Sequence, residues 1–298
     1  MSTRKVKRIT EELCGTSFSK STVSALCQAL DDLVHTWNER SLAGQRHPFV
    51  LVDALQLKLR HRGRVVPQSA LVAVAITAEG HRQILGMQIA DSESQTSWST
   101  FLAWLKGRGL TGVELIVSDA HQGLIQAIRR HFQGISWQRC QVHLMRDILG
   151  RCPAQHQRAL AGHVRTLFNA PDLAMARHLK EEVLTTYEEG APDAMTCLDE
   201  GFEDAMAVMA LPELYRRRLR STNSLERLIQ EVRRRERVIR IFPNRESALR
   251  LVGALLMEQD EEWSTGWRYF QMETYEAWKA EQVRTDGLKT ATGTDPAA

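Results

Sequence analysis

The stretch Phe49-Val50-Leu51-Val52-Asp53-Ala54-Leu55 places a carboxylate in the middle of an apolar run. Apolar residues at this density predict a β-strand from Phe49 to Leu59. Burial of a carboxylate within a strand is costly unless a cation or good hydrogen-bond donors meet it. Asp53 is therefore a candidate site residue that requires a partner. The alternative for a lone aspartate is a strand-end residue that faces water or bonds a neighbouring arginine.

The elements on the C-terminal side of this strand follow the order of a mixed sheet covered by helices. Two more strands are predicted over 70–77 and 83–89, with turn signals at Gly63 and Glu79-Gly80. The next predicted elements are a helix over 98–106, a strand over 113–118, a helix over 123–132 and a strand over 136–142. Three meandering strands followed by alternating helices and strands indicate an α/β fold.

One helical segment precedes this α/β region and another interrupts it, so the region consists of residues 46–148 and 213–280. Residues 1–45 are predicted to be helical, and the break at Gly15 fits either a DNA-binding helix-turn-helix or a helical pair that serves packing alone. Residues 149–212 lack any strand signal and are interpreted as a helical insertion. The last helices are predicted over 222–239 and within 245–279. The polar tail 281–298 is predicted to be disordered.

Asp119 and Glu226 are two further candidate carboxylates. Asp119 follows the apolar run 113–118 and precedes a helix, at the strand end where open α/β sheets place ligands. Its alternative role is helix capping. Glu226 shares a polar helix face with Asn223, Gln230 and Arg233, at helical spacing. Its alternative role is a capping box, because Asn223-x-x-Glu226 has that spacing.

Three carboxylates that meet at one end of a sheet suit phosphodiester chemistry. Two metal ions roughly 4 Å apart can activate the attacking oxygen and stabilise the leaving one. Mg²⁺ accepts a few carboxylates and keeps its other positions for water or substrate oxygens. The order of Asp53, Asp119 and Glu226 along the chain is compatible with such a site but does not establish it.

The charge distribution indicates a polyanionic partner. The net charge is only +3, yet ten arginines and three glutamates lie between Tyr215 and Arg240. Local basic clusters on a nearly neutral chain are typical of nucleic-acid binding, although arginines can also simply solvate a helix face. No apolar run approaches the roughly 20 residues that span a bilayer. Five scattered cysteines fit a reducing cytoplasm.

The pair Cys140-x-x-His143 has several interpretations. It supplies half of a zinc site, and no second pair stands at a recognisable spacing. A Cys–His hydrolase would need an orienting third residue, which the sequence does not identify. His143 could instead contact phosphate or water beside the metal site, or be a packed core histidine.

Five stretches of the sequence contain these motifs. They are Leu51–Ala54 with Lys58–Arg60; Lys106–Leu110; Val117–Leu124; Gln138–His143; and Arg220–Arg227, continuing through Arg233-Arg234-Arg235 to Phe242-Pro243. Taken together, they resemble the mutator-type transposases of bacterial insertion sequences. The resemblance covers most of residues 15–280 and implies a ribonuclease H-like fold with an all-helical insertion between the second aspartate and the glutamate.

The resemblance also implies an activity. Asp53, Asp119 and Glu226 would form a DDE triad that holds two Mg²⁺ ions, for which Mn²⁺ can substitute, and the chain would cleave and transfer DNA strands. Its partners would be the terminal inverted repeats, target DNA and a second copy in a homodimer, with no membrane. We accordingly expect a cytoplasmic, nucleoid-associated bacterial protein.

Other residues receive supporting roles from the same resemblance. Cys140 and His143 match the family's Cys/His signature near the site. Asn223, Arg227 and Arg233 match polar positions around the glutamate, and Arg233 takes the place of a basic residue that touches DNA. Arg234 and Arg235 extend this basic group.

Two departures from the family pattern open alternatives. Family members usually have more residues before the point where this chain begins, and Asp147 follows Arg146 where the family usually has Arg-Asn. One alternative is a truncated, inactive derivative that acts by occupying DNA. Another is a ribonuclease H-like nuclease that cuts without strand transfer.

Overall fold

One mixed sheet organises the chain, in the strand order β3-β2-β1-β4-β5. The computed structural model describes residues 19–291, and their side chains through 285. The strands are β1 (Phe49–His61), β2 (Arg64–Ile76), β3 (Arg82–Ala90), β4 (Leu115–Ser118) and β5 (Ser136–Arg139). The first three form an antiparallel meander, whereas β4 runs parallel to β1 and β5 parallel to β4. The predicted α/β class with a mixed sheet is confirmed.

Two strand predictions need correction at their ends. β2 begins at Arg64 rather than at residue 70, because the hairpin turn at Gly63, with φ +78°, lets β1 and β2 pair over their whole lengths. β5 ends at Arg139, and Gln141 already belongs to a helix. That helix starts where the Gln141 backbone N–H donates to the Arg220 carbonyl at 2.9 Å, a contact between segments far apart in sequence.

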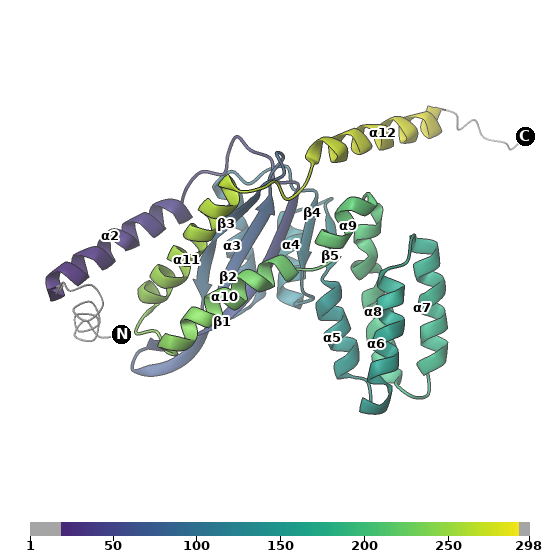
Figure 1. The fold of residues 1–298 in the computed structure, drawn as a ribbon, viewed down its shortest axis with the longest axis horizontal. Helices are drawn as coiled ribbons and strands as arrows, with labels where there is room; N and C mark the ends of the chain where they lie inside the picture. The colour runs from purple at the N-terminus through teal and green to yellow at the C-terminus, as the bar shows by residue number, and fades with distance from the viewer. Residues whose placement is uncertain (1–18, 292–298) are drawn as a thin grey trace, which may run out of the picture.

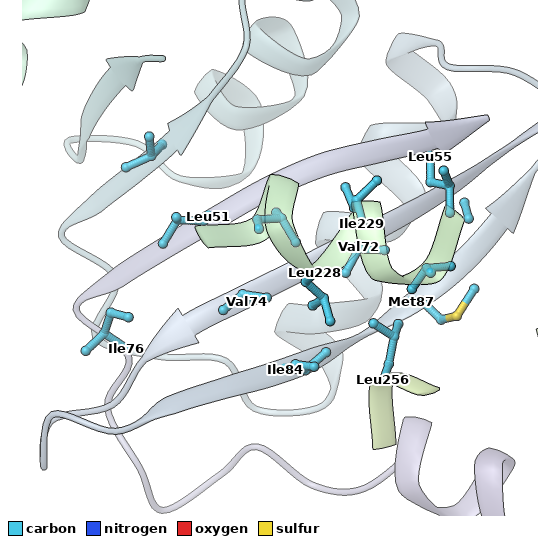
Figure 2. Packing of buried hydrophobic residues seen from close by; sticks show 14 of the residues in the cluster. Leu51, Leu55, Val72, Val74, Ile76, Ile84, Met87, Leu228, Ile229 and Leu256 are labelled. Atoms are coloured by element: carbon cyan, nitrogen blue, oxygen red, sulfur yellow. The ribbon is translucent and has the colours of Figure 1, made fainter. Parts of the chain in front are cut away.

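Helices cover both faces of the sheet (Figure 1). On one face, α3 (Gln95–Gly107) and α4 (Gln122–His131) bury Trp98, Phe101 and Leu124 against Val50 and Val52. On the other face lie α10 (Asn223–Ile239) and α11 (Arg245–Thr265). Figure 2 shows Leu228 and Ile229 of α10 beside strand residues such as Leu51 and Val72. The alternation of apolar side chains along β1 therefore supplies both cores.

The predicted insertion is helical throughout and lies beside the sheet (Figure 1). It comprises α5 (Gln141–Gly150), α6 (Ala154–Phe168), α7 (Leu173–Tyr187), α8 (Pro192–Met206), the 3-10 turn Ala207–Ala210 and α9 (Glu213–Leu219). These helices have their own apolar core, which includes Leu160, Val164 and Phe202. The buried Gln138 attaches this core to β5, since its amide donates to the Ala205 carbonyl at 2.7 Å and accepts from the Val208 N–H at 2.6 Å.

The two ends of the described chain are helical. α2 (Lys20–Asn38) packs on α11, where the Arg250 guanidinium contacts the Asp31 carboxylate at 2.6 Å. The earlier helix of the predicted helix-turn-helix lies outside the described residues. α12 (Met272–Ala291) corrects the prediction of disorder from 281 onward, because helix-forming residues such as Ala280 and Glu281 prolong it; residues 292–298 lie outside the described part.

No helix within residues 19–291 combines the length and apolar character that a bilayer crossing requires.

Candidate functional site

Asp53, in the middle of β1, and Asp119, directly after β4, lie just beyond the parallel pairing of these two strands. Leu51 on β1 pairs with Val117 on β4, so the two aspartates, each two residues further on, reach the same level of the sheet. Both are half-buried. Parallel pairing thus brings together two positions that are remote in sequence, at the carboxyl end of β4, which is the end where α/β sheets bind ligands.

The Asp53 carboxyl group has an unusual electrostatic environment. Burial raises its pKa to about 6 from 3.8, and the negative charges of Asp119 and Glu226 act in the same direction. The Ala54 N–H, which donates to Asp53 Oδ1 at 2.8 Å, and the nearby His143 oppose this increase. Among residues 19–285, no arginine or lysine forms an ion pair with Asp53, so its alternative role as an arginine partner is not seen.

Glu226 extends from the first turn of α10 toward the same region. The helix begins at Asn223, and its N-cap Thr222 makes no side-chain capping bond, so the alternative role as a capping box is wrong. Glu226 Oε1 is buried without a hydrogen-bond partner and lies 3.4 Å from His143 Nε2. An acceptor in that state is available to a ligand.

Cys140 and His143 connect the start of the insertion to the helix that bears Glu226. The backbone N–H and hydroxyl of Thr222 both donate to Cys140 Sγ at 3.4 Å. Interaction with Cys140 raises the pKa of His143 to about 9, although burial lowers it. Burial raises the pKa of the Cys140 thiol, but His143 and Thr222 outweigh it and lower the pKa overall.

These contacts distinguish two groups of donor atoms. Cys140, His143 and Glu226 each offer one atom within 4.8 Å of the others, and they are the only such group of three in the described part of the chain. The oxygens of Asp53, Asp119 and Glu226 are therefore more widely spread. A pair of ions about 4 Å apart needs a wider set of ligands than a single ion does, so this spread is compatible with the expected site.

Glu93 is a fourth carboxylate near the site that the sequence interpretation missed. It lies between β3 and α3, accepts a hydrogen bond from the Trp98 indole at 3.2 Å and is 3.9 Å from His121 Nδ1. Burial and the nearby Asp119 raise its pKa. No sequence signal identifies Glu93, because a polar residue ahead of a helix N-cap is typical of any loop.

The predicted basic residues fall into two locations. Asn223 and Arg227 are exposed and line a cavity of ≈ 1060 Å³ beside the start of α10. Arg233, Arg234 and Arg235 lie further along α10 and are exposed. Arg234 and Arg235 pair with Glu231 at 2.7 and 3.2 Å.

Asp147, one of the departures from the family pattern, accepts a hydrogen bond from the Arg139 guanidinium at 2.8 Å.

Comparison with known proteins extends over almost the whole chain. A sequence model described as "Transposase, Mutator family" matches residues 1–266. The transposase for insertion sequence element IS256 in transposon Tn4001 from Staphylococcus aureus is 45% identical over 88% of this chain and 68% of that protein. The transposase for element ISRM5 from Rhizobium meliloti is 43% identical over 92% and 68%, and that for IS1081 from Mycobacterium tuberculosis is 37% identical over 96% and 69%.

Proposed function

Because the chain belongs to the Mutator family of transposases, we propose that it cleaves and joins DNA strands by metal-dependent phosphoryl transfer at Asp53, Asp119 and Glu226. One observation carries this proposal. Asp53 on β1 lies close enough to Asp119, after β4, and to Glu226, on α10, for both negative charges to raise its pKa, and none of the three pairs with an arginine or lysine among the described residues. Like charges assembled in this way require a cation.

The topology supports a ribonuclease H-like fold for the catalytic region. An antiparallel meander continues into two parallel strands, and the aspartates lie on the two strands at its junction, β1 and β4. The third carboxylate arrives on a helix after a long helical insertion. This arrangement is the one expected for a DDE triad.

The three carboxylates fit divalent metal ions better than a structural role. Burial holds Asp53 at a raised pKa, and Glu226 Oε1 has no hydrogen-bond donor, so both groups gain from a cation. Oxygen ligands of this kind suit Mg²⁺, with Mn²⁺ as a substitute. When bound, two such ions would stabilise the attacking and leaving oxygens of an in-line displacement.

The surrounding residues would position these groups and the DNA. His143 Nε2, 3.4 Å from Glu226, orients the glutamate, and the Cys140–Thr222 contacts fix the start of its helix. Asn223 and Arg227, both exposed beside the start of α10, would contact the phosphates beside the scissile bond. In the proposed reaction, water attacks the phosphodiester at a transposon end and releases a 3′-hydroxyl. This hydroxyl then attacks a phosphodiester of the target DNA, and the 3′-oxygen of the target strand leaves. A homodimer would process two ends together.

The test is a nicking and joining assay on terminal inverted-repeat DNA with Mg²⁺ or Mn²⁺. Asp53→Asn should reduce strand cleavage by more than about 100-fold and leave DNA affinity largely unchanged. A loss of this size exceeds the one that is usual for residues that only support the metal ligands. Asp32→Asn, at an exposed position on α2, is the control and should cleave normally. Cleavage by the Asp53 variant would remove this residue from the triad.

The same assay separates the alternatives. DNA binding without cleavage by the unaltered chain would favour a derivative that acts by occupancy. Cleavage without joined products would favour a nuclease.

A further inference from the structure

The cavity beside the start of α10 is lined by arginines that form no ion pair within residues 19–285. It lies between the insertion, the start of α10 and the end of α11, and its volume is ≈ 1060 Å³. Six arginines and only two acidic residues line it. The arginines are Arg82, Arg165, Arg217, Arg218, Arg220 and Arg227. They come from β3, α6, α9 and α10 and from the residue that follows α9, so the fold gathers these charges from distant segments.

These cations lack anionic partners within residues 19–285. None of the six arginines forms an ion pair, whereas the lining residue Glu231 is already paired with Arg234 and Arg235. Burial lowers the pKa of Arg220, and the neighbouring Arg217 lowers it further. Burial likewise lowers the pKa of Arg82, with a further contribution from Arg218. Crowded like charges of this kind favour a bound polyanion.

Aromatic rings accompany the arginines. The Arg82 guanidinium lies 4.1 Å from the centre of the Trp263 ring and 5.0 Å from that of Tyr269, and both rings line the cavity. Arg218 lies 4.7 Å from Tyr269. In the same connection between α11 and α12, Trp267 is 98% exposed. Arginines that alternate with aromatic rings are typical of sites for unpaired nucleic acid, where bases stack and phosphates bind cations.

The cavity lies next to the elements that carry His143 and Glu226, although neither of these residues lines it. Its lining includes Val142, which precedes His143, and Asn223, one helical turn before Glu226. Stacking on the rings in this lining needs the face of an unpaired base, which a duplex keeps within its own stack.

We propose that this arginine cavity binds a single, unpaired DNA strand that continues from the cleaved phosphodiester. The arginines hold its phosphates, and a base stacks on the aromatic wall that Trp263 and Tyr269 provide. The exposed ring of Trp267, outside the cavity lining, offers a further stacking surface in the same connection as Tyr269. The proposal rests on the proposed function for the identity of the nucleic acid, but binding itself needs neither metal nor catalysis.

The experiment measures fluorescence anisotropy with the full chain bearing Asp53→Asn, in EDTA. The probes are a single-stranded DNA, the corresponding duplex, a duplex with a single-stranded extension, and a single-stranded RNA. The combined change Arg165→Gln and Arg217→Gln alters two exposed side chains that make no hydrogen bond among the described residues. The matched control is Arg158→Gln on α6 with Arg284→Gln on α12, both exposed and outside the cavity lining.

The cavity variant should lose about 10-fold or more in affinity for the single strand, and the slope of log affinity against log salt should fall by about 1.4. Affinity for the plain duplex should change less than twofold. Trp267→Ala should weaken single-strand binding by about 5-fold or more, since one base loses its stacking partner. The control should bind all probes normally.

Three results would overturn the proposal: equal losses for duplex and single strand, an equal loss in the control, or tighter binding of RNA than of DNA. Because the measurement excludes metal and catalysis, these results are independent of the cleavage assay. A chain that fails to cleave can still show the expected loss of single-strand binding.

Discussion

The two halves of α10 belong to one helix but have opposite surroundings. From Asn223 to Val232, apolar side chains at helical spacing pack on the sheet, and Leu225 is completely buried. From Arg233 to Ile239 that spacing is lost, and Val238 is 75% exposed. The packed half fixes the position of Glu226, whereas the exposed half presents arginines to solvent, two of them paired with Glu231. One part of the helix thus positions Glu226, and the other part carries the positive charges that would attract a polyanion.

The largest change in the free energy of unfolding should come from a substitution in the packed half of α10. Leu225→Ala removes a buried side chain from the main core and should lower the free energy of unfolding by about 2–5 kcal/mol. Val238→Ala, in the exposed half, should change it by less than about 0.5 kcal/mol. Urea denaturation of both variants measures the difference. Equal losses would mean that both halves pack similarly in solution.

The next effect concerns how the stability of the fold depends on pH. It should arise from Asp53, which lies near Glu226 in the packed half of α10. Its pKa in the folded state, about 6, exceeds the ordinary 3.8, so protonation of this group favours folding. That contribution is complete below pH 3.8 and is lost as the pH rises through about 6. Without metal, Asp53→Asn should therefore be more stable than the unaltered chain near pH 7, by about 3 kcal/mol.

Urea unfolding in EDTA at several pH values between 4 and 7 tests this effect. Parallel stability curves for the two proteins would show that Asp53 is not held at a raised pKa.

A smaller effect is expected from the exposed half. Arg233→Gln should reduce the salt slope of duplex binding by about 1, with a loss of affinity of a few fold, because one phosphate contact disappears. Cleavage at saturating DNA should be unchanged. A lower cleavage rate at saturation would instead place Arg233 at the catalytic residues.

The smallest effect should come from Glu231, at the border between the halves. Its pairs with Arg234 and Arg235 lower its pKa to about 2. Glu231→Gln frees both arginines and should strengthen duplex binding by roughly twofold, since surface ion pairs are weak. Anisotropy titrations at two salt concentrations measure the change, and weaker binding would show that the free arginines do not contact DNA.

Residues with periodic or apolar surroundings were predictable from the sequence. The apolar run around Asp53 predicts β1, and the spacing of Leu225, Leu228, Ile229 and Val232 predicts the buried face of α10. Both predictions are confirmed. The roles of the three carboxylates came from a family resemblance, and their use in catalysis stays a prediction.

Features assembled by tertiary contacts were not predictable. Glu93 approaches Asp119 only because β3 leads into α3 beside the end of β4. The arginine cavity combines Arg82, Arg165 and Trp263, which no local pattern connects. Within α12, Tyr275 makes an aromatic contact with Phe49, with ring centres 5.0 Å apart, and no local pattern connects these two residues.

The contact between Cys140 and Thr222 has a consequence for how the chain can vary. The chain leaves the sheet at Cys140 and returns at Thr222, and the two residues touch. Because the two ends of the insertion touch, the insertion can become longer or shorter, or be replaced by another domain, without moving those ends. The entropy cost of loop closure changes only slowly with loop length. Graft experiments could therefore replace the insertion while the sheet and its carboxylates stay in place.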